Sequence, residues 1–147
     1  MSEIETRQGW MSLLARAPAD RLERLWQGAG LAPTFAWLRA PEVGSVMVRG
    51  RTGATGQPFN LGEMTVTRCG LRLESGEVGH GYVQGRDKSH AERAALCDAL
   101  MQTEAAGRVR AAVLDPLEAE MAAAAQARAR KAAATKVDFF TLARGED

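Results

Sequence analysis

The chain has 147 residues, with 19 basic and 18 acidic side chains and a formal net charge of +1 at pH 7. This length suits a single domain over residues 1–147 that buries its own core. The balanced charge provides no general field that would attract nucleic acid or an anionic membrane. Cys69 and Cys97 lack the spacing of a zinc site or a disulfide framework, which favours two buried free thiols. Because no signal peptide and no membrane-spanning apolar run is recognisable, we expect a cytoplasmic protein.

The first 30 residues predict a helical hairpin. A helix is expected over residues 3–16, where apolar side chains recur at helical spacing, and Ala17 and Pro18 break it. A second helix follows, and Gly28 and Gly30 are expected to end it.

The middle of the chain predicts an antiparallel sheet of about four strands. Residues 34–39 and 45–51 are expected to form two strands, joined by a turn through Pro41, Glu42 and Gly44. A Gly-rich loop over 51–62 follows, and it lacks the Lys-Ser/Thr pair of a phosphate-binding loop. Residues 63–73 and 77–84 predict a hairpin that turns at 74–76.

A buried helix is predicted at about 89–103, directly after the last strand. Apolar side chains surround it almost completely, so it belongs in the middle of the domain or under a partner subunit. Gly85 permits a sharp turn before it, and residues 89–92 (SHAE) fit a capping box.

Polar residues crowd the first turn of this helix and form the candidate site. Helix starts present free N–H groups and a positive dipole end, where an anion can bind. Gly85 would allow close approach of such an anion, and Arg86 would offer a two-pronged grip. The same residues could simply cap and solubilise the helix start, and both interpretations stay open. The candidates for contact with substrate or with a neighbouring subunit are Gly85, Arg86, Asp87, His90, Glu92 and Arg93.

The C-terminal third predicts a long Ala-rich helix from Asp115, as a cap, to about Ala134, with Pro116 in its first turn. Residues 136–147 follow as a docking tail, because adjacent apolar side chains near a chain end need a surface to cover them. The side chains of this tail that are expected to dock are Val137, Phe139, Phe140 and Leu142. With helices at both ends and a sheet between them, the predicted fold class is α+β.

Three other functions match parts of this sequence. The triplet 90–92 (HAE) matches the H-x-E of zinc deaminases, but no P-C-x-x-C follows it. A metal held by His80, His90 and Glu92 would make the chain a free-standing metal-dependent hydrolase. A basic, nucleic-acid-binding helix is less favoured, because no aromatic residues lie among its cations. No complete catalytic or metal site is predicted. The cations concerned are Arg108, Arg110, Arg128, Arg130 and Lys131.

Four segments resemble the PhnG family, whose members are subunits of the bacterial carbon–phosphorus lyase system. They are residues 7–11 (RQGWM), 55–59 (TGQPF) with 65–68 (TVTR), 83–93 (VQGRDKSHAER) and 137–141 (VDFFT). The resemblance runs nearly end to end and in the same order. The family's central motif maps onto the same six candidate residues, from Gly85 to Arg93.

The resemblance implies a subunit of a core complex with PhnH, PhnI and PhnJ that breaks down organophosphonates. In that system PhnG, PhnH and PhnL support PhnI, which displaces adenine from MgATP with a phosphonate. The product is an α-D-ribose 1-alkylphosphonate 5-triphosphate. When the phosphonate is methylphosphonate, the product is α-D-ribose 1-methylphosphonate 5-triphosphate. The chemistry is credited mainly to PhnI, which implies a non-catalytic or site-completing role for this chain. MgATP is then a substrate of the complex, and this chain alone is expected to bind no cofactor.

Overall fold

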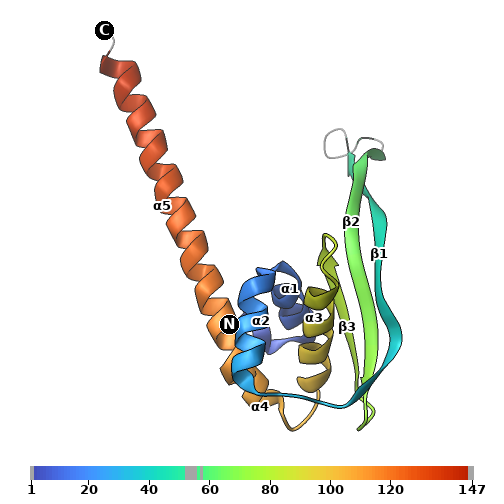
Figure 1. Ribbon diagram of the computed structural model, residues 1–147. Coiled ribbons are helices and arrows are strands. Elements are labelled where there is room, and N and C mark those ends of the chain that lie inside the picture. Colours follow the sequence, from blue (N-terminus) through green and yellow to red (C-terminus); the bar gives the residue numbers. More distant parts are fainter. Residues whose placement is uncertain (1, 52–55, 57, 146–147) are drawn as a thin grey trace.

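The computed structural model describes residues 2–51, 56 and 58–145, and the side chains at 51, 58, 60 and 138–145 lie outside this description. The fold is α+β, as predicted: helices cover one face of a three-stranded antiparallel sheet in the described part of the chain (Figure 1). One long helix and one long β-hairpin project from this body (Figure 1).

The predicted N-terminal hairpin is confirmed, with a different start. A 3₁₀ turn, η1 (Glu3–Glu5), precedes α1 (Arg7–Arg16), and α2 (Ala19–Ala29) packs beside it. The single helix predicted over 3–16 is wrong because Thr6 is extended and caps α1, accepting a hydrogen bond from the Gly9 N–H at 3.0 Å. Gly30, at φ 64°, ends α2, whereas Gly28 lies inside it.

The sheet has the strands β1 (Phe35–Arg51), β2 (Pro58–Leu73) and β3 (Val78–Gln84) in the order β1-β2-β3. The prediction of about four strands is wrong, because residues 34–39 and 45–51 belong to one strand. The expected turn at Pro41 is a bulge, where the register with β2 shifts between Arg39 and Glu42. Pro41 has no N–H to donate, and this is tolerated because β1 is an edge strand and pairs on one side only.

The predicted β2–β3 hairpin is confirmed, but β2 begins at Pro58, inside the expected Gly-rich loop. Residues 52–55 and 57 of that loop lie outside the description. β3 pairs only with residues 66–72 of β2, whereas β1 and β2 stay paired as far as Arg51 and Pro58. Residues 45–51 and 58–65 therefore form a two-stranded arm beyond the body (Figure 1).

The predicted buried helix is confirmed as α3 (Lys88–Leu100), which lies against β3. A Cβ atom added to Gly81 would lie 2.1 Å from the Ala91 carbonyl oxygen, and one added to Gly79 would lie 2.1 Å from that of Ala95. The helix therefore rests almost directly on the strand backbone. This contact requires glycine on the strand, and it favours the alanines of α3, whose side chains add little thickness.

After α3, the helical segments α4 (Ala106–Val109), η2 (Arg110–Leu114, a π-helical turn) and α5 (Asp115–Gly145) follow without a break. The prediction that Asp115 caps a new helix is wrong, because its backbone is already helical. Pro116 has no N–H for the carbonyl of Ala112, and this accounts for a widened turn just before it. Leu114 and Leu117 fix the base of α5 in the core.

Beyond its base, α5 leaves the body, and its side chains over 122–137 are mostly exposed (Figure 1). The helix continues through the segment predicted as a docking tail. Val137 is 62% exposed. The side chains of Phe139, Phe140 and Leu142 lie outside the description, so their docking stays a prediction. No described helix is long and apolar enough to cross a membrane.

Candidate functional site

The turn between β3 and α3 is held by a glycine and an aspartate. Gly85 has φ 97°, and its carbonyl accepts a hydrogen bond from Thr67 Oγ1 at 2.7 Å. Asp87 caps α3 by accepting from the His90 N–H at 2.9 Å. The capping box predicted at 89–92 is therefore wrong, because Asp87 already caps the helix and Ser89 lies within its first turn.

His90 joins α3 to α1. Its side chain is buried, and its Nε2 lies 2.8 Å from the Leu14 carbonyl oxygen. Because a carbonyl can only accept, Nε2 carries the proton in this contact. His90 thus contributes to packing between the two helices.

Arg93 joins α3 to α2. Its Nε donates to Glu23 at 2.7 Å, its Nη1 donates to Glu92 at 3.3 Å, and the guanidinium lies 6.0 Å from the centre of the Trp26 ring. The hydrogen bond with Arg93 lowers the pKa of Glu23, and the same bond raises the pKa of Arg93. An ion pair and a cation–π contact therefore fix this side chain.

Arg86 differs from its neighbours. It is exposed and forms no hydrogen bond or ion pair within residues 2–51, 56 and 58–145. Of the six candidates, Gly85, Asp87, His90 and Arg93 thus have structural roles, and Glu92 is half-buried beside Arg93. Arg86 is the charged candidate left available to a ligand or subunit. Contact of the cluster with substrate or subunit stays a prediction.

The three residues of the hydrolase alternative do not form a metal site. His80 is exposed on β3, whereas His90 is buried and its Nε2 is hydrogen-bonded to the carbonyl oxygen of Leu14. Among the described residues, no three His, Cys, Asp or Glu side chains are placed to hold a metal ion. The geometry therefore gives no support to a hydrolase built on His80, His90 and Glu92.

Asp98 is a structural centre that the sequence analysis did not single out. Its carboxylate is fully buried and accepts from Arg7 Nε and Nη2, from Trp10 Nε1 and from the backbone N–H of His80. All four distances lie between 2.8 and 3.1 Å. A carboxylate inside an otherwise apolar helix was the available signal, because a buried charge needs partners.

The two thiols are buried and free, as predicted. Burial raises the pKa of Cys69 to about 11 and that of Cys97 to about 12. The Cys69 thiol also donates to the Ala91 carbonyl at 3.3 Å. Both groups stay protonated at neutral pH, which makes them poor nucleophiles.

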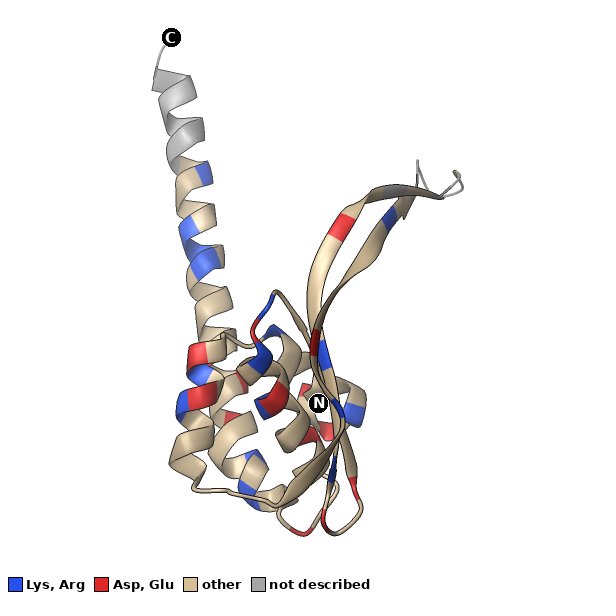
Figure 2. Cartoon of the chain, turned by 45° about the vertical axis from the view of Figure 1, so that its right-hand side comes forward, with Lys and Arg blue, Asp and Glu red and all other residues tan. Residues whose placement is uncertain are grey.

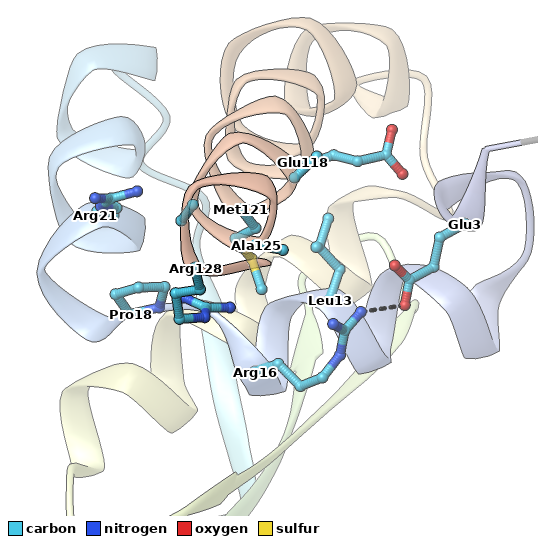
Figure 3. Close-up of a pocket in the computed structure, with 11 residues that line it drawn as sticks. Glu3, Leu13, Arg16, Pro18, Arg21, Glu118, Met121, Ala125 and Arg128 are labelled. Carbon is cyan, nitrogen blue, oxygen red and sulfur yellow. Dashed lines mark hydrogen bonds and ion pairs between the residues drawn. The ribbon is translucent and has the colours of Figure 1, made fainter. Parts of the chain in front are cut away.

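A hollow of about 440 Å³ lies between α1, the start of α2 and the base of α5 (Figure 3). Arg16 points to Glu3 across it and forms an ion pair (Figure 3). Glu118 accepts a hydrogen bond from Ser2 at 2.7 Å. Arg21 and Arg128 also line the hollow, and Arg21 lies 3.9 Å from Glu120. Apart from Arg128, its charged groups are thus paired, and the hollow is mainly a junction between helices.

The comparisons with known proteins agree with the segments noted in the sequence. The family described as "Phosphonate metabolism protein PhnG" matches residues 5–145. The chain belongs to the PhnG family. A curated relative from Rhizobium meliloti (strain 1021), "Alpha-D-ribose 1-methylphosphonate 5-triphosphate synthase subunit PhnG", is 46% identical over 144 residues. The alignment covers 98% of this chain and 92% of the relative.

The PhnG match includes the parts that project from the body. Residues 5–145 contain the arm and the whole of α5, as well as the Asp98 cluster and the start of α3. The first PhnG-like segment, 7–11, supplies Arg7 and Trp10 to Asp98, so its function within the fold is structural. The central segment, 83–93, forms the turn from β3 into α3.

Proposed function

We propose that this chain is a subunit of the synthase that makes α-D-ribose 1-methylphosphonate 5-triphosphate during organophosphonate catabolism. In this reaction a phosphonate is transferred to the ribose C1 of MgATP and adenine is released. The observation that carries the proposal is the 46% identity, over 98% of the chain, to a relative named as a subunit of that synthase.

Within the assembly, this chain has a non-catalytic or site-completing role. The packing contacts of His90 and Arg93 support this, because they engage the polar groups at the start of α3 inside the fold. The bond-making groups then belong to other subunits, chiefly PhnI. MgATP is a substrate of the whole complex, and this chain alone holds no cofactor.

The proposed partners are PhnH, PhnI and PhnJ, with PhnL as a functional partner, in the cytoplasm. Exposed apolar side chains on the strands support a role in assembly, because a partner that covers them would remove apolar surface from water. A two-stranded arm is also only marginally stable in water, and contact with a partner would stabilise it. The exposed large side chains on the strands are Trp37, Leu38, Val43, Met47, Phe59, Leu61 and Tyr82.

The projecting part of α5 provides a second surface for these partners. Residues 121–137 contain basic side chains and no Asp or Glu. Figure 2 shows blue segments and no red ones on the described part of α5 that projects from the body. An acidic surface on another subunit would complement it. The cations are Arg128, Arg130, Lys131 and Lys136.

Co-expression with PhnH, PhnI and PhnJ tests the proposal. The complex is purified through a tag on this chain, and adenine release from MgATP and methylphosphonate is measured with PhnL added. We expect a stable assembly whose adenine release is lost when this chain is left out. Recovery of this chain alone, or adenine release that does not need it, would contradict the proposal.

A pair of matched variants tests the arm. Phe59→Ser with Leu61→Ser makes the exposed end of the arm polar, whereas Glu74→Ser changes an exposed residue at the opposite turn, between β2 and β3. We expect the first variant to lose partners in the pull-down and the second to keep them. Circular dichroism of both isolated chains shows whether the fold is unchanged.

A further inference from the structure

The exposed face of the sheet contains a hollow above a glycine. In the strand register, Arg39 of β1 lies opposite Gly70 of β2, and Gly70 lies opposite His80 of β3. Directly opposed residues place their side chains on the same face. Because neighbouring strands are about 4.8 Å apart, the backbones of Arg39 and His80 lie roughly 10 Å apart on either side of Gly70. The His80 ring leans over the glycine, because its Nδ1 lies 3.3 Å from the place that a Cβ of Gly70 would take.

This hollow measures about 440 Å³, within the range of small-molecule sites. In the adjacent row of the sheet, Arg68 lies opposite Tyr82. The lining thus combines two guanidinium groups, an imidazole, a phenol ring and an apolar side chain. Its residues are Leu38, Arg39, Arg68, Cys69, Gly70, His80, Gly81 and Tyr82.

The positive charge of the hollow is not neutralised locally. No acidic residue lines it. Arg39 and Arg68 are exposed and form no ion pair or side-chain hydrogen bond with any described residue. Glu42 lies opposite Arg68 in the register, but these two side chains form no ion pair in the described part of the chain. Two unpaired guanidinium groups at one concave site favour a ligand with several anionic oxygens.

The hollow is separate from the start of α3. Along β3, Gly79 and Gly81 face α3, whereas His80 and Tyr82 alternate with them and are exposed. The sheet therefore lies between this hollow and the body of α3, and the two surfaces can be tested independently.

We propose that this hollow binds a tetrahedral phosphorus oxyanion, carried by a nucleotide or by a free phosphonate. Arg39 and Arg68 would each grip the oxygens with paired N–H groups, and His80 would contribute a further donor. Tyr82 and Leu38 would contact the less polar part of the ligand. The identity of these ligands rests on the proposed function, since MgATP and a phosphonate are the substrates of that synthase.

Calorimetric titration of the full chain tests this proposal, with MgATP, methylphosphonate and inorganic phosphate as separate probes. We expect binding, and we expect Arg68→Gln to weaken it about tenfold or more, since the charge-assisted hydrogen bonds of the guanidinium to the oxyanion are lost. Gly70→Val should weaken binding as well, because its side chain would press on the His80 imidazole and displace it. Binding of MgATP alone identifies the nucleotide as the source, and competition by methylphosphonate identifies the phosphonate.

Arg72→Gln is the matched control. Arg72 is exposed on the same strand, opposite Ala36 and Val78, and it does not line the hollow. Equal weakening by Arg72→Gln would show a general charge effect and overturn the proposal. So would an Arg68→Gln variant that loses its partner subunits but binds the probes normally, because the hollow would then be a subunit contact.

The assembled complex separates this proposal from the proposed function. Adenine release by the wild-type complex tests the function of the chain. In a complex that releases adenine, Arg68→Gln should raise KM for MgATP or for methylphosphonate. Absence of binding by the isolated chain, together with unchanged KM values in the Arg68→Gln complex, would overturn the site and leave the proposed function standing.

Discussion

Arg7 holds the buried carboxylate of Asp98 through two nitrogens, with Nε at 3.1 Å and Nη2 at 2.9 Å. Trp10 and the backbone of His80 fill the remaining acceptor positions at 2.8 and 2.9 Å. One carboxylate thereby joins α1, β3 and α3. All four partners are hydrogen-bond donors, so the side chain at position 98 has to supply only acceptors. A carboxylate does so, whereas an amide does not.

Asp98→Asn should lower the free energy of unfolding by about 2–4 kcal/mol. The amide places its own N–H₂ group against donors and removes the charge that pairs with Arg7. Urea denaturation measures the loss. Arg110→Ala, which removes the surface ion pairs with Glu5 and Asp115, is the control and should leave the urea midpoint nearly unchanged. Similar midpoints for the two variants would contradict the role given to Asp98.

Gly81→Ala should destabilise the chain by about 3 kcal/mol or more, at the upper end of the cost of overpacking. The added methyl group would meet the Ala91 carbonyl at 2.1 Å, so α3 would have to move away from the sheet. Gly44→Ala is the matched control in β1, because a Cβ there meets nothing within 4 Å. Thermal unfolding distinguishes them: equal melting temperatures would mean that α3 does not lie tightly on β3.

Arg86→Ala should lower adenine release by the assembled complex about tenfold, the loss expected for one charge-assisted contact. It should leave the melting temperature of the chain unchanged, because Arg86 is exposed and has no hydrogen bond or ion pair to lose among the described residues. Lys88→Ala, at an exposed neighbour, is the control and should have little effect on release. A fully active Arg86→Ala complex would remove the functional interpretation of the α3 start.

Glu23→Gln should make the free energy of unfolding fall less steeply as the pH is lowered below about 4.5. The hydrogen bond with Arg93 holds the pKa of Glu23 below its ordinary value of 4.5 in the folded chain. The unfolded chain therefore takes up this proton first as the pH falls. The contribution is complete above pH 4.5 and is lost as the pH falls from there through the lower folded value. Urea midpoints between pH 6 and pH 3 should fall less steeply in the variant than in the wild type.

Cys69 and Cys97 should resist thiol reagents in the native chain. Burial raises both pKa values, to about 11 and about 12, so the thiolate is scarce and shielded. With Ellman's reagent at pH 8, both should react only as fast as the chain unfolds, and at once in denaturant. Rapid labelling of either thiol in the native chain would show that α3 opens locally.

The elements that could be predicted from sequence are those whose signals are local. The N-terminal hairpin, the β2–β3 turn and the apolar character of α3 all follow from residue spacing within one element. The bulge at Pro41 could not be distinguished from a turn, since a proline and a glycine three residues apart are typical of both. Only the edge position of β1 decides between them, and that depends on the whole sheet.

The residues that gather at the candidate site could be predicted from sequence, but the contacts that each of them makes could not. The sequence shows that charges gather at the start of α3, but not that Arg93 is paired with Glu23 on α2 while Arg86 is unpaired. Those facts depend on contacts between residues far apart in the chain. Asp98 was missed for the same reason, because its partner Arg7 lies 91 positions away. The hollow above Gly70 likewise needs the register of three strands.

The π-helical turn at Arg110–Leu114 lies at the base of α5, where the helix leaves the body of the fold, so a change at this turn would tilt the whole helix. The helix runs for 31 residues, which corresponds to a rod of about 46 Å. A tilt of about 10° at its base would carry the far end through roughly 8 Å. Small rearrangements around Leu114 and Leu117 would thus become large displacements at the far end, and a subunit holding that end would register changes within this chain's core.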